Sequence, residues 1–240
     1  MTAVTRTGPD RTRDAAPAPR GNRALVAVLV AVIAVALVAL GGGLAVALGI
    51  GRTDPPGTGS VDAGFARDMS THHLQAVEMA NLAQTRSADP QVQQLAFDIS
   101  STQNNQAGRM RGWLSLWDLP LKGGDGVMSW MGGEGGHGMH DMGEMQAAEA
   151  RGALMPGMAT EDDLARLRSL TGTPFDVLFL QLMIRHHQGG LAMAQDGAAH
   201  AQEPAVRALA RTIAETQTAE ATTMEQMLRA KGGAPLPADA

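Results

Sequence analysis

The chain has no cysteine and no tyrosine, and only seven of its 240 residues are aromatic. Without cysteine there is no disulfide framework, thiolate zinc site, iron–sulfur cluster or cysteine nucleophile. The sequence also has no G-x-S-x-G nucleophile elbow and no P-loop motif, so neither nucleophilic hydrolysis nor nucleotide binding has support. Residues 53–240 carry 13 basic and 22 acidic side chains, a net charge of −9. This balance argues against nucleic acid as a partner and permits a metal cation.

What the sequence does contain begins with a long apolar run near the N-terminus. Residues 24–50 are 27 residues without a charge, and about 20 apolar residues suffice to span a bilayer as a helix. Five arginines precede the run and only Arg52 follows it closely, which predicts a cytoplasmic N-terminus and an extracytoplasmic main domain. A cleaved signal peptide remains an alternative, because Ala45–Ala47 fits a small-residue cleavage site, and the domain would then be secreted. We expect a disordered tail over 1–23, a transmembrane helix or signal anchor over 24–50, and a linker over 51–60.

The exported part contains an internal repeat. Residues 62–114 align with 176–228 at a constant shift of 114 residues without a gap, and 17 of these 53 positions are identical. In both copies apolar residues recur at steps of three and four, which is typical of amphipathic helices. Asp89-Pro90 in the first copy, and Thr173-Pro174 and Pro204 in the second, resemble helix starts. No window alternates with period two, so no strand is expected.

Two such hairpins predict an all-α fold, an antiparallel four-helix bundle built from a duplicated helical hairpin. The predicted domain covers 61–231, with repeat 1 at 62–118, an insert at 119–159, a short helix at 160–171 and repeat 2 at 174–231, followed by a tail at 232–240. The insert differs in composition, since residues 123–158 hold eleven glycines and seven of the fifteen methionines. So much glycine predicts no regular helix there, and methionines in a segment without a core are not expected to serve as packing. Thr160 to Asp163 resembles a capping box.

The candidate metal ligands come from the pattern Met-x-x-His-His-(x)5-Met, which occurs once in each copy. On a helix its first methionine and its two histidines converge on one flank, and the second helix of each hairpin adds further candidates. Imidazole and thioether together suit Cu(I), Ag(I) and, to a lesser degree, Cu(II). The helical candidates are Met69, His72, His73, Met79 and Met110 in the first copy, and Met183, His186, His187, Met193, Glu220 and Met224 in the second. The insert adds His137, Met139, His140 and Met142. The competing interpretation is that the methionine and histidine stripes are only core.

The motifs around Phe65-x-x-x-Met69-x-x-His72-His73 and around Met183, His186-His187 and Met193 resemble the domain-of-unknown-function family 305 (DUF305) over about residues 61–230. The resemblance implies an exported bacterial domain with a ferritin-like four-helix arrangement. CopM-type members of the family bind copper and silver and are linked to metal resistance. In the first copy Gln106 stands where the family motif has a glutamate, the position of Glu220 in the second copy.

We therefore expect a membrane-anchored extracytoplasmic protein that binds copper or silver ions for sequestration, transfer or resistance. It is expected to have no organic cofactor and no catalytic activity, and the sequence identifies no protein partner. One alternative is a non-catalytic helical interaction module whose Met/His stripe is only core. Another is a ferritin-like metal oxidase, but that chemistry needs Glu-x-x-His on two helices and further inward glutamates. The only Glu-x-x-His is Glu134–His137, in the insert, and Glu220 is the only glutamate on an inner stripe.

Overall fold

The structure is a computed structural model that describes residues 21–49, 54–123, 126–131 and 139–236. The described residues form seven helices and no strand. The chain divides into two compact units, residues 1–54 and 55–240.

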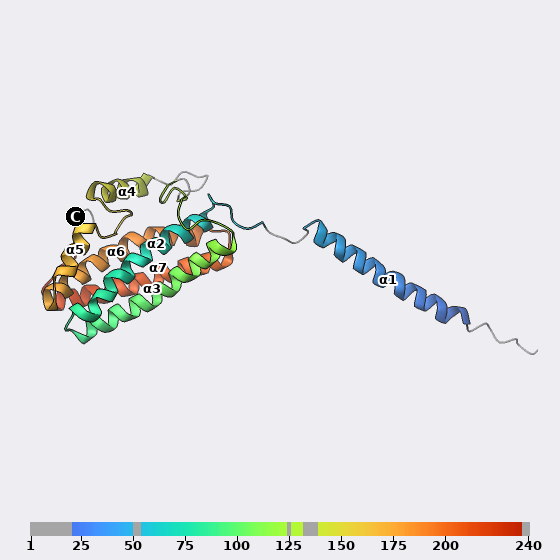
Figure 1. The fold of residues 1–240 in the computed structure, drawn as a ribbon, viewed down its shortest axis with the longest axis horizontal. Coiled ribbons are helices and arrows are strands. Elements are labelled where there is room, and N and C mark those ends of the chain that lie inside the picture. The colour runs from blue at the N-terminus through green and yellow to red at the C-terminus, as the bar shows by residue number, and fades with distance from the viewer. Residues whose placement is uncertain (1–20, 50–53, 124–125, 132–138, 237–240) are drawn as a thin grey trace, which may run out of the picture. The chain divides into compact units, whose positions relative to one another are not determined.

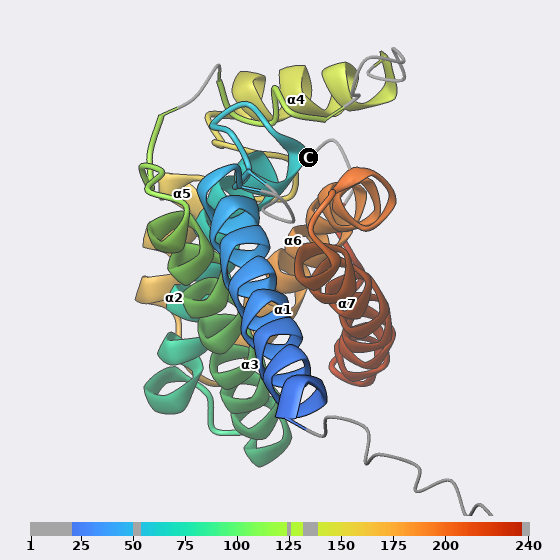
Figure 2. The same ribbon diagram turned by 90° about the vertical axis from the view of Figure 1, so that its right-hand side faces the viewer.

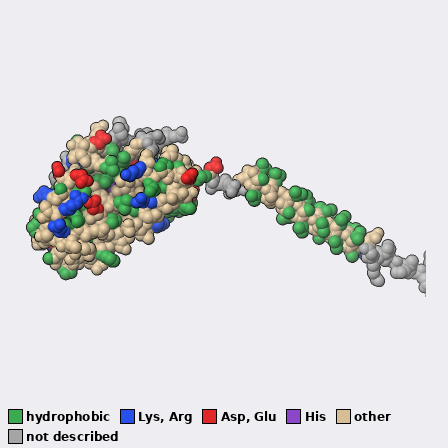
Figure 3. Space-filling model, in the orientation of Figure 1, with side chains coloured by type: hydrophobic (Ala, Val, Ile, Leu, Met, Phe, Trp, Pro, Cys, Tyr) green, Lys and Arg blue, Asp and Glu red, His purple; other side chains and the backbone are tan. Residues whose placement is uncertain are grey.

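The first unit contains a single helix, α1 (Gly21–Ala47). Its segment Asn22–Ala47 has a mean hydropathy of 3.1, and none of it is buried in the structure. Figure 3 shows hydrophobic side chains along the whole visible length of this helix, whereas charged side chains are scattered over the visible face of the larger unit. The helix is long and apolar enough to cross a membrane, as the sequence predicts.

The second unit is an all-α bundle of four long helices, as predicted. These are α2 (Val61–Arg86), α3 (Pro90–Leu116), α6 (Gly172–His200) and α7 (Pro204–Ala230). Helix α2 packs on α3, α6 packs on α7, and α2 packs on α6, so the four lie side by side (Figure 1). Adding 114 to the bounds of α3 gives the bounds of α7. The second helices of the two hairpins thus match in length, whereas α6, with 29 residues, is longer than α2, with 26.

Local sequence explains where these helices begin. The Ser60 hydroxyl accepts a hydrogen bond from the Ala63 N–H, at 3.2 Å, and caps α2. At the start of α3 the Asp89 carboxylate accepts from the Gln91 N–H at 2.8 Å, with Pro90 in the first turn, as predicted. Helix α6 begins at Gly172, ahead of the predicted Thr173-Pro174 start. A proline in the first turn lacks only an N–H that would be unpaired there, so the helix can begin before it.

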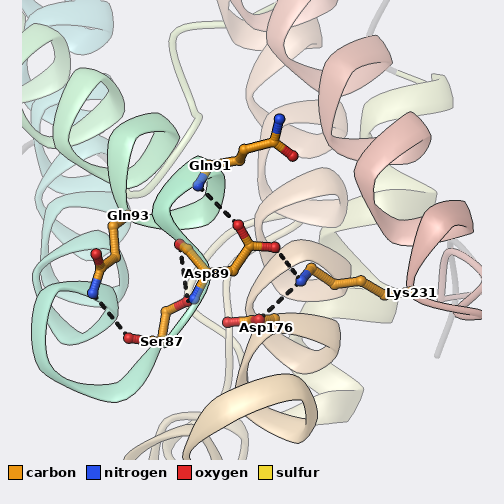
Figure 4. A network of polar contacts seen from close by, with 6 residues as sticks. All are labelled: Ser87, Asp89, Gln91, Gln93, Asp176 and Lys231. Atoms are coloured by element: carbon orange, nitrogen blue, oxygen red, sulfur yellow. Dashed lines mark hydrogen bonds and ion pairs between the residues drawn. The ribbon is translucent and has the colours of Figure 1, made fainter.

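An ion-pair network joins the end of the second hairpin to the first (Figure 4). The Lys231 ammonium lies 2.5 Å from a carboxylate oxygen of Asp89 and 3.0 Å from one of Asp176. Hydrogen bonding to Lys231 lowers the pKa of Asp89. At the other end Asp62, the repeat counterpart of Asp176, accepts the backbone N–H groups of residues 202 and 203 at 2.9 and 2.8 Å. The two equivalent aspartates thus hold the hairpins together at opposite ends.

Replacing Lys231 with methionine is expected to lower the free energy of unfolding by about 2 kcal/mol, because the nearly buried Asp176 would lose its cationic partner. Urea denaturation of the exported part measures this change. Lys122→Met is the matched control, since Lys122 is the other lysine of the chain and is exposed, and we expect a change within about 0.5 kcal/mol. Equal stability of K231M and the parent would show that this network does not hold the hairpins together.

The insert contains a regular helix, so the prediction that it has none is wrong. Helix α4 runs from Met139 to Arg151, and it lies outside the four long helices in both ribbon views (Figures 1 and 2). Eight of the eleven glycines of residues 123–158 precede position 139, and only Gly143 falls within the helix. Averaging the glycine content over the whole insert concealed a stretch of good helix formers.

The expectation that the methionines of the insert do not serve as packing is also wrong for three of them. Met128, Met155 and Met158 are buried against the bundle. Trp130 anchors the segment, because its indole N–H and the Met128 backbone N–H both donate to one oxygen of Asp68, at 2.8 and 2.7 Å. Burial raises the pKa of this carboxyl. The insert shares the core of the bundle, which its composition did not indicate.

After the insert, helix α5 (Glu161–Ser169) begins with the predicted capping box. The Thr160 hydroxyl accepts from the Asp163 N–H, and the Asp163 carboxylate accepts from the Thr160 N–H, both at 3.1 Å. The same carboxylate pairs with the nearly buried Arg185 of α6 at 2.6 Å. These contacts fix the short helix against the second hairpin.

Candidate metal site

The four predicted histidines form one layer across the middle of the bundle. His72 and His73 lie on α2, His186 and His187 lie on α6, and none is more than 1% exposed. The ring centroids of His72 and His186 are 3.8 Å apart, and those of His186 and His187 are 6.4 Å apart. The sequence predicted one half-site per hairpin, whereas the structure brings imidazoles of both hairpins together.

Each imidazole of the histidine layer uses its Nε2 atom to reach an oxygen. His72 Nε2 lies 3.3 Å from the Pro156 carbonyl, and His186 Nε2 lies 3.1 Å from the His72 carbonyl. His73 Nε2 is 2.8 Å from Oε1 of Gln106. His187 Nε2 is 2.7 Å from Oε2 of Glu220. Since all four partners are hydrogen-bond acceptors, each Nε2 carries the hydrogen and donates.

Burial keeps the imidazoles of His72, His73 and His186 neutral. Loss of hydration lowers the pKa of His72 to about 4 and that of His73 to about 3. It also lowers the pKa of His186 well below the ordinary value, with the charges of neighbouring histidines as a further cause. A neutral imidazole that donates from Nε2 has a lone pair on Nδ1.

Within the part of the chain that the structure describes, the Nδ1 atoms of all four histidines are buried and have no hydrogen-bond partner. The side-chain amides of Gln103 and Gln217, which are repeat counterparts, are likewise buried without a partner among the described residues. Gly190 lets these groups pack close to α6, because a methyl group there would lie 3.0 Å from Oε1 of Gln217 and 3.4 Å from Nδ1 of His72. An unpaired buried acceptor costs about 1–3 kcal/mol. A cation bound by these lone pairs would recover that cost.

The six helical methionines of the candidate set lie in two apolar clusters and are fully buried. One cluster contains Met69, Met110 and Met193 together with Phe65. The other contains Met79, Met183 and Met224 together with Phe175 and Phe179. The two methionines of each sequence motif therefore belong to different clusters, so the motif does not form a single ligand set. Their burial in apolar surroundings agrees with a packing role.

The candidates in the insert are not brought to the histidine layer by any described contact. His137 lies outside the described residues. Met139, His140 and Met142 fall in α4, where the structure describes only the backbone at these positions. They remain predictions.

A turn of the insert covers the histidine layer instead. Besides the Pro156 carbonyl on His72, the backbone of Ala159 pairs with the side-chain amide of Gln75 in both directions, at 2.8 and 2.9 Å. Gly189, the repeat counterpart of Gln75, lets Pro156 approach so closely that a methyl group there would lie 2.2 Å from its carbonyl oxygen. Sequence reasoning missed these residues because the contacts join segments 33 and 84 residues apart. The Gly189-Gly190 pair within a helix was the only signal.

The two halves of the histidine layer differ in charge. Glu220 places a carboxylate on the outer nitrogen of His187, and its side chain is 19% exposed. In the first copy the same position is Gln106, an uncharged amide that is buried on His73. Glu220, predicted as a metal ligand, thus accepts a hydrogen bond from Nε2 of His187, on the side of the ring opposite to Nδ1. A carboxylate in this position usually orients a metal-binding imidazole.

Among the described residues, no three His, Asp or Glu side chains form a ready-made metal-binding group. The unpaired donor atoms that the histidine layer offers are imidazole nitrogens and the amide oxygens of Gln103 and Gln217. Imidazole favours ions of the copper type over hard ions such as magnesium or calcium.

Comparison with known proteins agrees with this architecture. The family model described as "Domain of unknown function (DUF305)" matches residues 62–228. The crystal structure of a DUF305 protein from Streptomyces coelicolor is similar at 39% identity and a TM-score of 0.65, covering 75% of this chain and 99% of that one. A DUF305 fragment from Deinococcus radiodurans is similar at 32% identity and a TM-score of 0.56, with coverage of 71% and 96%.

The Cu(II)-bound form of CopM is similar at 27% identity and a TM-score of 0.51, covering 71% of this chain and 97% of CopM. CopM has also been solved with Cu(I) and with silver, and in those forms its likeness to this chain, at 23% and 22% identity, concerns the fold alone. No curated protein matches the chain.

Proposed function

The chain belongs to the DUF305 family, and on that premise we propose that its four-helix domain binds a soft metal ion, copper or silver, in the histidine layer. The observation that carries this proposal is the set of four buried Nδ1 atoms that have no partner among the described residues. Each of these imidazoles already donates its other nitrogen to an oxygen. This arrangement is typical of metal-binding histidines, because the second hydrogen bond orients the ring and selects the tautomer. The Cu(II)-bound relative supports copper as the ion.

We further propose that the protein holds or hands over the ion rather than transforming it. Glu220 is the carboxylate in contact with the histidine layer among the described residues, and a di-iron type oxidase needs several inward carboxylates. Imidazole ligands remain usable outside the cytoplasm, where thiols tend to oxidise. Helix α1 would keep the domain at the outer face of the membrane, or would be removed if it is a signal peptide. Sequestration, transfer and metal resistance all fit this placement.

The test is a titration of the exported part, residues 55–240, with Cu(I), followed by native mass spectrometry. This part has its own core, and the solved relatives correspond to it in extent. We expect the parent to bind copper and the H72A/H73A/H186A/H187A variant to lose that binding. His200→Ala, which removes an exposed histidine, is the control and should bind as the parent does.

Two other outcomes would contradict the proposal. Equal copper binding in the parent and the four-alanine variant would move the site to the insert candidates His137, Met139, His140 and Met142. No binding in either would favour an interaction module whose methionines and histidines are only core. Because four alanines leave cavities in the bundle, circular dichroism must first show that the variant is folded. The H73Q/H187Q pair, which keeps side-chain volume and polarity, gives a milder second test with the same expected direction.

A further inference from the structure

A groove between α6 and α7 leads from the surface to the histidine layer. It encloses about 190 Å³. Its floor is made by His187 and Gln217, which are 1% and 3% exposed. The rest of its lining, which forms its rim, combines the polar residues Thr218, Thr222 and Glu225 with the apolar Leu191 and Ala221. The groove therefore joins solvent to two buried residues with polar atoms that no described residue pairs with, namely Nδ1 of His187 and both amide atoms of Gln217.

The repeat offers a direct comparison with the other face of the bundle. In the first copy the floor residues are the same, since His73 and Gln103 are the counterparts of His187 and Gln217. The rim is not the same: the counterpart of Glu225 is Arg111, and the counterpart of Gln188, another rim residue, is the partly exposed Leu74. One face thus presents an acid and an amide above its histidine, and the other presents a cation and a leucine.

We propose that the α6–α7 groove is the route by which the metal cation enters the histidine layer, with Glu225 as the carboxylate that attracts it at the rim. This inference rests on the proposed function and adds the direction of loading. A negative rim over a narrow groove concentrates cations, whereas Arg111 on the equivalent face repels them. Glu225 is available for this role, because its side chain is 34% exposed and its one ion pair, with the exposed Arg229, is long, at 3.4 Å.

Behind the rim the groove meets groups that can accept the ion in turn. The amide oxygen of Gln217 and the Nδ1 atom of His187 accept no hydrogen bond from any residue that the structure describes. The Glu220 carboxylate, 2.7 Å from Nε2 of His187, stabilises a positive charge carried by that ring or by an ion bound to it. The same ring in the first copy has only the neutral Gln106 behind it. Charge thus favours the second copy at both the rim and the floor.

The experiment measures the rate of loading of the exported part with aqueous silver ion at low ionic strength. The protein is mixed with the ion, a thiol scavenger removes unbound silver after set times, and native mass spectrometry counts bound ions. We expect Glu225→Arg to slow loading about tenfold and Glu225→Gln to slow it about threefold, because a single charge at the mouth sets the local cation concentration. The final number of bound ions should not change, and the effect should shrink as salt is added.

Two matched controls distinguish an effect of charge at the groove from an effect of the protein's net charge on the loading rate. Glu215→Arg makes the same change in net charge at an exposed position of α7 that does not line the groove, and it should change the rate less than twofold. Arg111→Glu makes the face of the first copy acidic, and it should also leave the rate within about twofold if that face is not used.

The possible results are distinguishable. Equal rates in E225R, E215R and the parent, with silver bound by all three, would overturn the entry route and leave the proposed function standing. A faster rate in R111E comparable in size to the loss in E225R would also overturn a single route. A parent protein that takes up no silver and no copper would overturn the proposed function, and the entry route with it.

Discussion

Lowering the pH from 8 to 5 is expected to reduce the free energy of unfolding of the metal-free exported part by about 6 kcal/mol. Three buried histidines have a folded-state pKa far below the ordinary value of 6.5. The pKa is about 4 for His72 and about 3 for His73, and that of His186 is also well below the ordinary value. Their contribution to stability is complete above pH 6.5 and is lost as the pH falls toward the folded-state values, because only the unfolded chain gains protons in that window. At pH 5 the loss is about 2 kcal/mol per histidine.

Urea denaturation at pH 8, 6.5 and 5 in the presence of a chelator measures this dependence. Exposed carboxylates with ordinary pKa values remain largely ionised across this range, so the window reports mainly on histidine. The control is His73→Gln, which should remove about a third of the pH dependence because it removes one of the three groups. A free energy of unfolding that is constant from pH 8 to 5 would mean that the folded histidine layer takes up protons freely. The tight neutral packing described above would then be wrong.

Replacing Gly189 with alanine is expected to lower the free energy of unfolding by about 3 kcal/mol. The added methyl group would lie 2.2 Å from the carbonyl oxygen of Pro156 and 2.5 Å from the backbone nitrogen of Gly157. Both are backbone atoms, which cannot move aside as a flexible side chain can. The turn of the insert would have to shift, and the hydrogen bond from His72 to the Pro156 carbonyl would be lost with it.

The matched control for G189A is Gly108→Ala in α3, where an added methyl group meets nothing within 4 Å. That substitution should stabilise the domain by about 0.5–1 kcal/mol, since alanine favours a helix interior over glycine. Denaturant unfolding of both variants and the parent provides the comparison. Equal stability of G189A and the parent would show that the turn does not pack on α6 as described, and that the histidine layer is open on this side.

The bundle itself could be predicted from the sequence because its signals are local or repetitive. Helical periodicity repeats over 26 to 29 residues in the long helices, and a shift of 114 residues aligns the two copies without a gap. Helix starts such as Asp89-Pro90 and the box at Thr160 depend on atoms within three residues of each other. Patterns of this kind can be recognised in the sequence without any knowledge of the tertiary structure.

The arrangement of the candidate site could be predicted only in part. The histidines were found because they are adjacent in sequence and repeated. Their contact across the bundle could not be predicted, because the 3.8 Å distance between the rings of His72 and His186 depends on how the two hairpins pack. The division of the methionines follows from the same packing, since Met69 and Met79 point into different apolar clusters of the bundle. The buried methionines of the insert, such as Met155, were missed because composition does not show what a segment covers.

The absence of cysteine and the surplus of methionine are properties of the sequence alone, and they limited the chemistry to imidazole, thioether and carboxylate ligands. The sequence also determined the helices, since each forms from contacts within a few residues along the chain. Only the tertiary structure decided which nitrogen of each histidine remains unpaired. The acceptors that occupy the Nε2 atoms lie 33, 84 and 114 residues away in the chain. Hydrogen bonds across such separations exist only once the hairpins and the insert have packed, and they leave the Nδ1 lone pairs available for an ion.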